Sequence, residues 1–300
     1  MAKCKTLYPT HVVKLYKRSS RMNRIIKKRQ LSADVFRFTF EAPHIARERK
    51  AGQFLIIQLD NDFAERFPLT IADADENAGT VDIIFQAVGA STMKLAAMEE
   101  GQAIANVLGP LGTPTHIEKF DAPVVCVGGG IGVAPMHPIV QAHKAVGNTV
   151  IVIMGARNSD LLVMQDEMGE LADELIICTD DGSAGRKALV TEPLKELCEA
   201  EVPPAQVVAI GPPVMMKFCA ATTRPYEIST LVSLNTIMVD GTGMCGGCRV
   251  TVNGETKFVC VDGPEFDGHA VDFENLMLRL QAYRPHEDDH RCRVGAGGAA

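Results

Sequence analysis

The segment VCVGGGIGVAP, residues 125–135, decides how the chain is expected to fold. It begins as a short apolar strand, passes through four glycines, and reaches Ala134 and Pro135, where a helix is predicted to begin. Glycines at the carboxyl end of a strand let the backbone approach a diphosphate, and the following helix N-terminus supplies N–H groups and a positive dipole. The strict G-x-G-x-x-G spacing is absent because Val133 replaces its last glycine. A plain strand–helix turn therefore stays an alternative to a dinucleotide-binding turn.

The chain around this segment repeats the same alternation. Apolar strands without polar alternation, NTVIVIMGA, DELIICTDD and AQVVAIGPP, are separated by helix-like segments, which is typical of a parallel doubly wound sheet. Ligands of such sheets gather at the carboxyl ends of the strands. Loops at that edge offer Arg157, Asp181 and the pair Gly211-Pro212, and Arg157, Arg186 or Lys187 could meet the 2′-phosphate of NADP.

The preceding stretch has the pattern of a small antiparallel β-barrel. DVFRFTFEA, GQFLIIQLD and TVDIIFQAV alternate or run apolar between turn residues. Within it, RFPLTIAD (66–73) places a cation, a proline and a hydroxyl on one strand. The segment VGASTMKL (88–95) follows a glycine with Ser91 and Thr92 at a predicted helix start, which indicates a phosphate cradle or an ordinary helix cap.

A cysteine cluster follows the predicted sheet. DGTGMCGGCRV (240–250) holds Cys245 and Cys248, and Cys260 lies on the far arm of a hairpin whose turn is Asn253-Gly254. Glycines let the backbone approach an inorganic centre and donate N–H bonds to it. No second Cys-x-x-Cys pair is present, so the spacing favours an iron–sulfur cluster over a structural zinc site.

Three residues compete for the fourth ligand position. Asp240 stands at the mouth of the loop, whereas His269 and Cys292 lie well outside it. A carboxylate is a harder donor than a thiolate but carries the same charge. On composition alone Asp240 is equally well interpreted as a turn or cap residue.

Composition and charge bound the function. The net charge is −7, yet residues 1–29 contain ten Lys and Arg and no acid. We expect this arm to be a solvated extension, or to precede a true start at Met22, and nucleic-acid binding is the alternative. No apolar run is long enough to span a membrane. Nine cysteines without a disulfide pattern indicate a reducing compartment, and we expect a cytoplasmic protein in which Cys126 and Cys178 are buried.

Taken together, these motifs resemble the ferredoxin–NADP reductase superfamily over residues 22–285. The resemblance implies a flavin-binding strand and a loop on the flavin diphosphate, with Thr70 near the flavin's reactive edge. It implies a nicotinamide-nucleotide loop at GGGIGVAP and a closing element at GPPVMM. The residues carried over for FAD are Arg66, Pro68, Leu69, Thr70, Gly89, Ser91 and Thr92, and those for NAD(H) are Gly129, Gly130, Gly132, Arg157, Asp181, Gly211 and Pro212.

The C-terminal stretch narrows the resemblance. It is similar to the iron–sulfur segment of dihydroorotate dehydrogenase electron-transfer subunits, with Asp240 in place of the first of four cysteines. That variant is more similar to the FAD subunits of NADH-dependent reduced ferredoxin:NADP oxidoreductases. The likeness favours iron over zinc and makes Asp240, Cys245, Cys248 and Cys260 the expected ligands of a 2Fe–2S cluster.

The resemblance also implies the function. Hydride passes between NAD(H) and FAD, and single electrons pass through the cluster to a larger FAD and iron–sulfur subunit, with ferredoxin and electron bifurcation beyond it. NADP(H) is not excluded, and no nucleic acid or membrane partner is expected. No protein acid–base residue is expected, since the cofactors carry the chemistry. The alternatives are a dihydroorotate dehydrogenase subunit and a non-enzymatic zinc scaffold. The expected divisions are a basic extension (1–21), an FAD barrel (22–120), an NAD(P) domain (121–225) and a cluster subdomain with tail (226–300).

Overall fold

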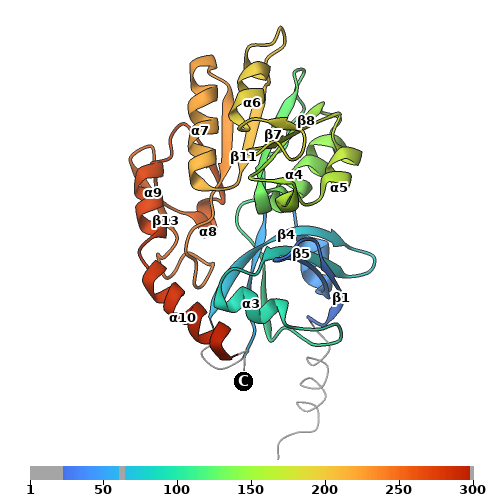
Figure 1. The fold of residues 1–300 in the computed structure, drawn as a ribbon, viewed down its shortest axis with the longest axis vertical. Helices are drawn as coiled ribbons and strands as arrows, with labels where there is room; N and C mark the ends of the chain where they lie inside the picture. Colours follow the sequence, from blue (N-terminus) through green and yellow to red (C-terminus); the bar gives the residue numbers. More distant parts are fainter. Residues whose placement is uncertain (1–22, 61–64, 298–300) are drawn as a thin grey trace, which may run out of the picture.

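The computed structural model describes residues 23–60 and 65–297, in three parts that Figure 1 shows packed against one another. A β-barrel and a nucleotide-type α/β sheet form two of them, and the C-terminal segment runs along the side of both. The predicted basic extension 1–21, Met22 and the last residues of the Gly/Ala tail lie outside the described residues.

The first part is an antiparallel sheet in the order β1-β2-β5-β4-β3-β6. Its core is aromatic, because Phe38, Phe40 and Phe85 are fully buried on its inner face. The predicted antiparallel flavin-type module is therefore confirmed as a fold. Its elements are β1 (Ile25–Gln30), β2 (Val35–Glu41), α2 (Pro43–Glu48), β3 (Phe54–Gln58), β4 (Arg66–Asp75), β5 (Thr80–Gln86), α3 (Ala90–Ala96) and β6 (Asn106–Leu111).

The second part is a sheet in the order β10-β9-β8-β7-β11-β12-β15, parallel except for β15. Val125 and Val127 pack toward α6 and α7, whereas Val124 and Cys126 pack toward α4 and α5, so helices cover both faces as predicted. Its elements are β7 (Val124–Gly129), α4 (Val133–Ala145), β8 (Val150–Ala156), α5 (Gln165–Leu171), β9 (Glu174–Thr179), β10 (Arg186–Lys187), α6 (Thr191–Cys198), β11 (Gln206–Ile210), α7 (Pro213–Thr223) and β12 (Ser229–Ser233). Short 3₁₀ turns cover Gly130–Gly132, Ser159–Leu161 and Arg224–Tyr226.

Two strands of this sheet lie beyond residue 225. Strand β12 pairs in parallel with β11, and β15 (Glu265–Asp267) pairs antiparallel with β12. The C-terminal segment thus completes the edge of the nucleotide sheet before and after it forms the cysteine cluster. Pattern alone did not place these strands there, because their pairing partners lie far away in the sequence.

The remaining C-terminal elements are a hairpin and three helices. Strands β13 (Arg249–Val252) and β14 (Glu255–Phe258) pair across Asn253-Gly254, whose φ angles of 52° and 78° confirm the predicted turn. Helices α8 (Val259–Asp262), α9 (Phe273–Leu280) and α10 (Arg284–Gly297) follow, and α10 reaches α3 of the barrel (Figure 1).

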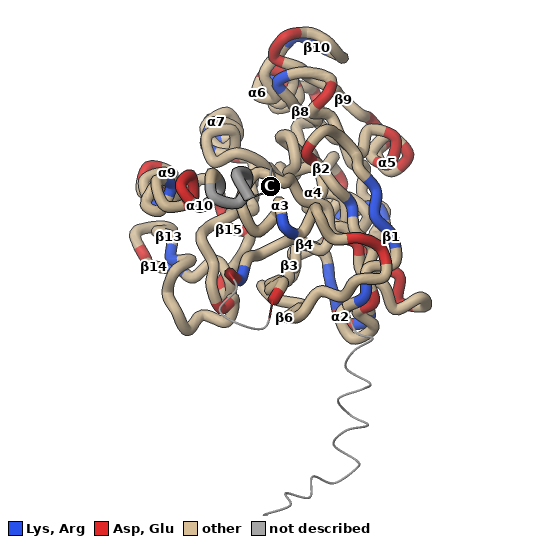
Figure 2. Tube along the Cα trace, turned by 60° about the horizontal axis from the view of Figure 1, so that its bottom comes forward, with Lys and Arg blue, Asp and Glu red and all other residues tan. Residues whose placement is uncertain are grey.

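Surface charge is mixed over most of the described chain. Lys and Arg line β1 at one side of the barrel (Figure 2), but Lys28 of that strand is paired with Glu99 at 2.8 Å. The burial predicted for Cys126 and Cys178 is confirmed. Among the described helices, none has the length and apolar character needed to cross a bilayer.

Candidate functional site: a two-pair donor loop beside a flavin-type strand

Asp240 is the hydrogen-bonding centre of the loop between β12 and β13. Its Oδ2 accepts from the Thr242 hydroxyl at 2.8 Å and from the Met244 N–H at 2.9 Å. The thiol of Cys245 donates to its Oδ1 at 3.0 Å. These bonds, the Cys245 thiol first, hold the pKa of Asp240 well below its usual range. The carboxylate therefore acts as a turn residue and also faces the first cysteine.

Cys248 and Cys260 form a second pair on the hairpin. Their Sγ atoms lie 3.2 Å apart, and both side chains are buried. The register is set by the Val259 N–H, which donates to the Cys248 carbonyl, and by the Cys260 N–H, which faces the Cys248 sulfur at 3.5 Å. Burial, followed by the neighbouring Cys248 thiol, raises the pKa of Cys260 to about 12. Such a thiol ionises readily only when a cation binds it.

The four donors are arranged as two pairs. Within the described residues, no three His, Cys, Asp or Glu side chains converge closely enough to hold a single metal ion. A structural zinc ion takes four ligands on one atom, so this arrangement does not fit zinc. Two pairs, Asp240 with Cys245 and Cys248 with Cys260, suit a centre that has two metal atoms with two protein ligands each. The donor set therefore fits an iron–sulfur cluster.

The other two candidates for the fourth donor are engaged or distant. His269 places its Nε2 2.9 Å from the Thr223 hydroxyl, which in turn contacts Thr230. Cys292 is exposed on α10, the helix that reaches α3 at the far side of the barrel. Neither belongs to the two pairs.

The cysteine loop packs directly on the barrel. Gly241 has φ +74°, and a Cβ added there would come within 2.8 Å of Ile56 Cγ1 and Leu111 Cδ1. Ile56 pairs with Pro68 of β4 in the sheet register. On the opposite side, Arg279 donates to the carbonyl oxygens of Gly247 and Arg249 at 3.1 Å. The loop is thus held between α9 and strands β3 and β6, and β3 pairs with β4, the strand predicted to bind flavin.

Alternation along β4 divides the residues predicted to contact flavin. Arg66, Pro68 and Thr70 fall on one face, because side chains of a strand alternate. Leu69 falls on the other face with Phe67 and packs against the barrel core. The structure therefore brings three of the four residues onto one surface, and only the backbone of Leu69 is left to contact a ligand there.

The predicted phosphate cradle also shows a capping arrangement. The Gly89 N–H donates to the Thr92 hydroxyl at 3.0 Å, and this hydroxyl faces the Gly89 carbonyl at 3.0 Å. Ser91 hydrogen-bonds the Glu65 carboxylate, which joins α3 to the start of β4. The Ser91 contact brings the start of α3 to Glu65, the residue before Arg66.

The glycine loop at the end of β7 is formed by close backbone contact. A Cβ added at Gly132 would clash with the Ile210 carbonyl, and one at Gly211 would lie 3.1 Å from Gly129 Cα. Strand β7 pairs with β8 on one side and with β11 on the other. The loop thus lies at a topological switch point, where such sheets bind their ligands. Gly129, Gly132 and Gly211 are brought together there, and Met215 covers Gly129.

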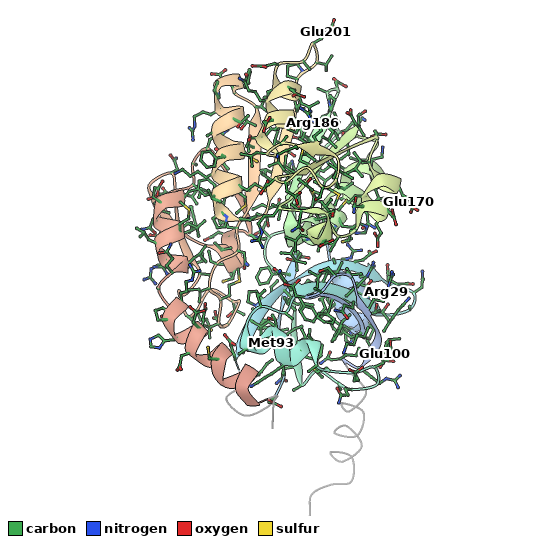
Figure 3. The ribbon with its side chains drawn as sticks, viewed as in Figure 1. Arg29, Met93, Glu100, Glu170, Arg186 and Glu201 are labelled. Atoms are coloured by element: carbon green, nitrogen blue, oxygen red, sulfur yellow. The ribbon has the colours of Figure 1, made fainter. Side chains whose placement is uncertain are left out.

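Strand-end loops bring the remaining nucleotide candidates side by side. The Asp181 N–H donates to the Arg157 carbonyl at 3.2 Å, so the loops after β8 and β9 are in contact. Hydrogen bonds from Ser183 lower the pKa of Asp181. Arg186, labelled in Figure 3 on the outer strand β10, is held by Glu196 through two bonds of 2.6 and 2.7 Å. Arg157 is exposed and no ion pair holds it within the described chain.

Sequence reasoning missed two features of the site. One is a contact between Thr115 and Glu265, separated by 150 positions, whose hydroxyl and carboxylate lie 2.7 Å apart. The other is the bond of 3.1 Å between His137 of α4 and the Ala72 carbonyl of β4, which joins the nucleotide helix to the flavin-type strand. The local sequence around Glu265, DGPEFDG, is that of a turn, and nothing in it or around His137 predicted either contact.

Comparison with protein families identifies all three parts of the chain. Residues 23–116 match the oxidoreductase FAD-binding domain, and residues 126–221 match the oxidoreductase NAD-binding domain. Residues 235–272 match the iron–sulfur cluster binding domain of dihydroorotate dehydrogenase B. These domains support FAD, NAD(H) and an iron–sulfur cluster as cofactors, which confirms the cofactor classes expected from the sequence.

Individual relatives agree with the domains. A Thermotoga maritima protein named as a dihydroorotate dehydrogenase B (NAD(+)) electron transfer subunit homolog is 46% identical over 266 residues, 89% of this chain and 93% of its own. The corresponding Clostridium perfringens electron transfer subunit is 32% identical, over 74% of this chain and 87% of its own. A solved chain of NADH-dependent reduced ferredoxin-NADP oxidoreductase superposes with a TM-score of 0.85 at 44% identity, covering 91% of this chain and 97% of that one. With the FAD-type barrel, the NAD-type sheet and the cluster loop all in place, this chain belongs to the family of the dihydroorotate dehydrogenase B electron-transfer subunits and their homologues, and is an oxidoreductase subunit of that electron-transfer type.

Proposed function

We propose that this chain passes electrons between NAD(H), an FAD on the barrel and a 2Fe–2S cluster, and exchanges them with a larger flavo-iron–sulfur subunit. One observation carries the proposal: three ligand-type segments meet on the ribbon β3–β4. The cysteine loop lies on Ile56, the partner of Pro68, and the nucleotide helix bonds Ala72. FAD supplies the link between two-electron hydride exchange with NAD(H) and one-electron exchange with an iron–sulfur cluster.

The barrel residues have the chemistry to hold FAD. Arg66 offers the positive charge for a diphosphate, and the Ser91 hydroxyl at α3 could donate to it in place of its bond to Glu65, while Thr92 caps the helix through Gly89. Pro68 and Thr70 lie on the same face of β4 as Arg66. Thr70 pairs with Phe54 in the register, next to the cysteine loop's contact on Ile56. This order along the strand supports a diphosphate near Arg66 and the reactive ring near Thr70.

The strand-end loops favour NAD(H) over NADP(H). Arg186 is already held by Glu196 and so is not free for a 2′-phosphate, which leaves Arg157 and Lys187 as the cations on these loops. Asp181 is ionised and lies against the Arg157 loop, and an acidic residue suits a ribose 2′-hydroxyl. Gly129, Gly130, Gly132, Gly211 and Pro212 supply the close backbone approach that a dinucleotide needs.

Asp240, Cys245, Cys248 and Cys260 are the proposed ligands of the cluster. A less electron-rich donor in place of a thiolate raises the reduction potential of such clusters. Asp240 is therefore expected to make this cluster easier to reduce. Replacing it by cysteine, Asp240→Cys, should retain a cluster with a lower midpoint potential, and Asp240→Ala should lose iron. A titration that gives an unchanged or higher midpoint for Asp240→Cys would reject this role.

The partner is proposed to dock over the cysteine loop. Met244, next to Cys245, is 88% exposed, and Val239 and Val261 flank the loop with exposed apolar side chains. Apolar residues of this kind around a redox site fit a protein partner. The likeness to the solved ferredoxin-NADP oxidoreductase chain favours that type of complex, with ferredoxin as the distant acceptor or donor and electron bifurcation at the partner. We also propose that this chain functions in the cytoplasm.

Anaerobic purification with flavin, iron and acid-labile sulfide analysis tests the proposal. The expected product is yellow-brown, contains one FAD and two irons per chain, and bleaches on addition of NADH. A colourless protein with bound zinc would establish a scaffold instead. Co-purification of the untagged partner separates the two enzyme alternatives, because a dihydroorotate dehydrogenase would mark this chain as its electron-transfer subunit, as the names of several relatives suggest.

A further inference from the structure

Glu265 is a carboxylic acid at the point where the three parts of the molecule meet. It belongs to β15, opposite Ser233 of β12 at the edge of the nucleotide sheet. Its Oε1 accepts a hydrogen bond of 2.7 Å from Thr115, in the segment that follows the barrel. The same oxygen would lie 3.0 Å from a Cβ added at Gly52. The carboxyl group is therefore enclosed by barrel backbone on one side and by the nucleotide sheet on the other.

The segment that leads to Glu265 connects the proposed cluster ligand Cys260 with the barrel. Upstream, the chain leads from Cys260 through Gly263, whose carbonyl accepts from the Thr113 N–H at 2.6 Å. Pro264 and Phe54 both crowd Gly112, within 3.0 and 2.9 Å of its would-be Cβ. Phe54 is the register partner of Thr70. Glu265 thus lies five positions after a proposed ligand, and its neighbour Pro264 and the register partner of Thr70 both pack on Gly112.

Among the described residues, no Lys, Arg or His forms an ion pair with the Glu265 carboxylate, and the causes of its pKa shift include no cation. From the barrel side it meets the Thr115 hydroxyl and the Gly52 backbone, and from β12 the Ser233 backbone. From β7 the titratable group that senses it is the Cys126 thiol, whose pKa its charge raises further. Burial raises the pKa of Glu265 to about 7, and the Thr115 hydrogen bond opposes this only in part. Near neutral pH the carboxyl group is therefore only partly ionised.

We propose that Glu265 takes up a proton when the neighbouring redox centres gain electrons and releases it when they lose them. The reason is electrostatic, since an added negative charge nearby disfavours a second one in a poorly solvated site. The step is balanced: a solvent proton joins a carboxylate oxygen for the negative charge that arrives, and no other bond changes. This role rests on the proposed function, because it needs the FAD and the cluster near β4 and Cys260.

Proton uptake on reduction tests the role without measuring turnover. The anaerobic holoprotein, weakly buffered with a pH indicator dye, is reduced by dithionite at pH 7.5 and at pH 5.5. At pH 7.5 the wild type should take up a substantial fraction of one proton more than Glu265→Gln. At pH 5.5 this difference should disappear, because the carboxyl group is already protonated. If the wild type and Glu265→Gln took up equal amounts of protons at pH 7.5 as well as at pH 5.5, the proposal would be overturned.

Control variants separate this role from structural damage. Asp267→Asn changes an exposed carboxylate of the same strand and should keep wild-type uptake. Thr115→Ser retains the hydroxyl bond and should also match the wild type, whereas Thr115→Val should move the pH at which the extra uptake appears to higher values. If Asp267→Asn lowers uptake as much as Glu265→Gln, the assignment to Glu265 is wrong. Visible spectra separate a failure of the Glu265 role from a failure of the proposed function, because a wild type without flavin or cluster absorbance refutes the proposed function itself.

Discussion

Two glycine-rich loops of this protein, the nucleotide loop (128–133) and the cysteine loop (240–248), are built on different physical grounds. In the nucleotide loop the glycines are required by packing, because the backbone of Ile210 occupies the space that a side chain at Gly132 would need. In the cysteine loop, Gly241 has a positive φ and packs on the barrel where there is no space for a Cβ. The Asp240 carboxylate accepts hydrogen bonds from Thr242 and Met244 of the same turn. The nucleotide loop is shaped by the sheet, whereas the cysteine loop is shaped by side chains that are proposed to ligate the cluster.

This difference teaches where each loop obtains its order. Strand pairing on both sides of β7 holds the nucleotide loop whether or not a ligand is bound. The cysteine loop has no strand pairing within itself and depends on three bonds to Asp240 and on the anchoring by Arg279. Ligand removal should therefore affect the two loops unequally.

The largest expected effect is loss of the cluster from Cys260→Ala. Removing one of four donors leaves a metal atom with a single protein ligand, so bound iron and sulfide should fall at least tenfold. Iron analysis and visible absorbance measure this, with Cys292→Ala, on the exposed helix α10, as the matched control. A Cys260→Ala protein with full iron content would remove the hairpin cysteine from the ligand set.

Iron chelation sharpens the comparison of the two loops next. Amide hydrogen exchange should accelerate about tenfold or more over residues 240–248 after iron removal, because the loop then relies on its few hydrogen bonds. The amides of residues 129–135, in the nucleotide loop and just after it, should exchange at an unchanged rate. Equal acceleration in both loops would contradict the idea that the sheet alone orders the nucleotide loop.

Gly132→Ala breaks the nucleotide loop through packing. Its new Cβ meets the Ile210 carbonyl, which belongs to β11 and cannot rotate away. The expected loss is about 2–3 kcal/mol of unfolding free energy, typical of overpacking, seen as a lower thermal midpoint. Gly254→Ala is the comparison variant, because its φ is positive at +78° and nothing lies within 4 Å, whereas Gly132 has an ordinary helical φ of −61°. A smaller loss from Gly132→Ala than from Gly254→Ala would show that backbone conformation outweighs packing.

The smallest expected effect is a pH dependence of the unfolding free energy that comes from His143 in α4 of the nucleotide sheet. His143 is fully buried, its Nδ1 faces Asn148 at 3.0 Å, and burial lowers its pKa. The unfolded state therefore binds a proton at His143 more readily than the folded state does. The stability that neutral His143 contributes to the fold is present above the ordinary histidine pKa of about 6.5 and is lost as the pH falls below it. The loss amounts to at most about 1.4 kcal/mol per pH unit. Denaturation at pH 7.5 and 5.5 should show a flatter pH dependence for His143→Leu than for the wild type. An identical slope would assign the acid sensitivity to other groups.

Much of the site was predictable from the sequence because its signals are local. Cys245-x-x-Cys248, the Asn253-Gly254 turn and the glycines after β7 each depend on neighbours within a few residues. Strand alternation in β4 was also readable, although it places Leu69 on the face opposite Thr70. Family likeness then connected these motifs to FAD, NAD(H) and an iron–sulfur cluster.

The sequence by itself determined the kinds of element, the two types of sheet and the spacing of the three cysteines proposed as ligands, because periodicity, turn chemistry and thiol spacing are local properties. Only the tertiary structure decided that β12 and β15 finish the nucleotide sheet, that the donors form two pairs, and that Thr115 meets Glu265. These facts depend on groups up to 150 positions apart. The physical reason is that burial and long-range pairing are properties of the packed chain, whereas a sequence pattern records only what each segment favours alone.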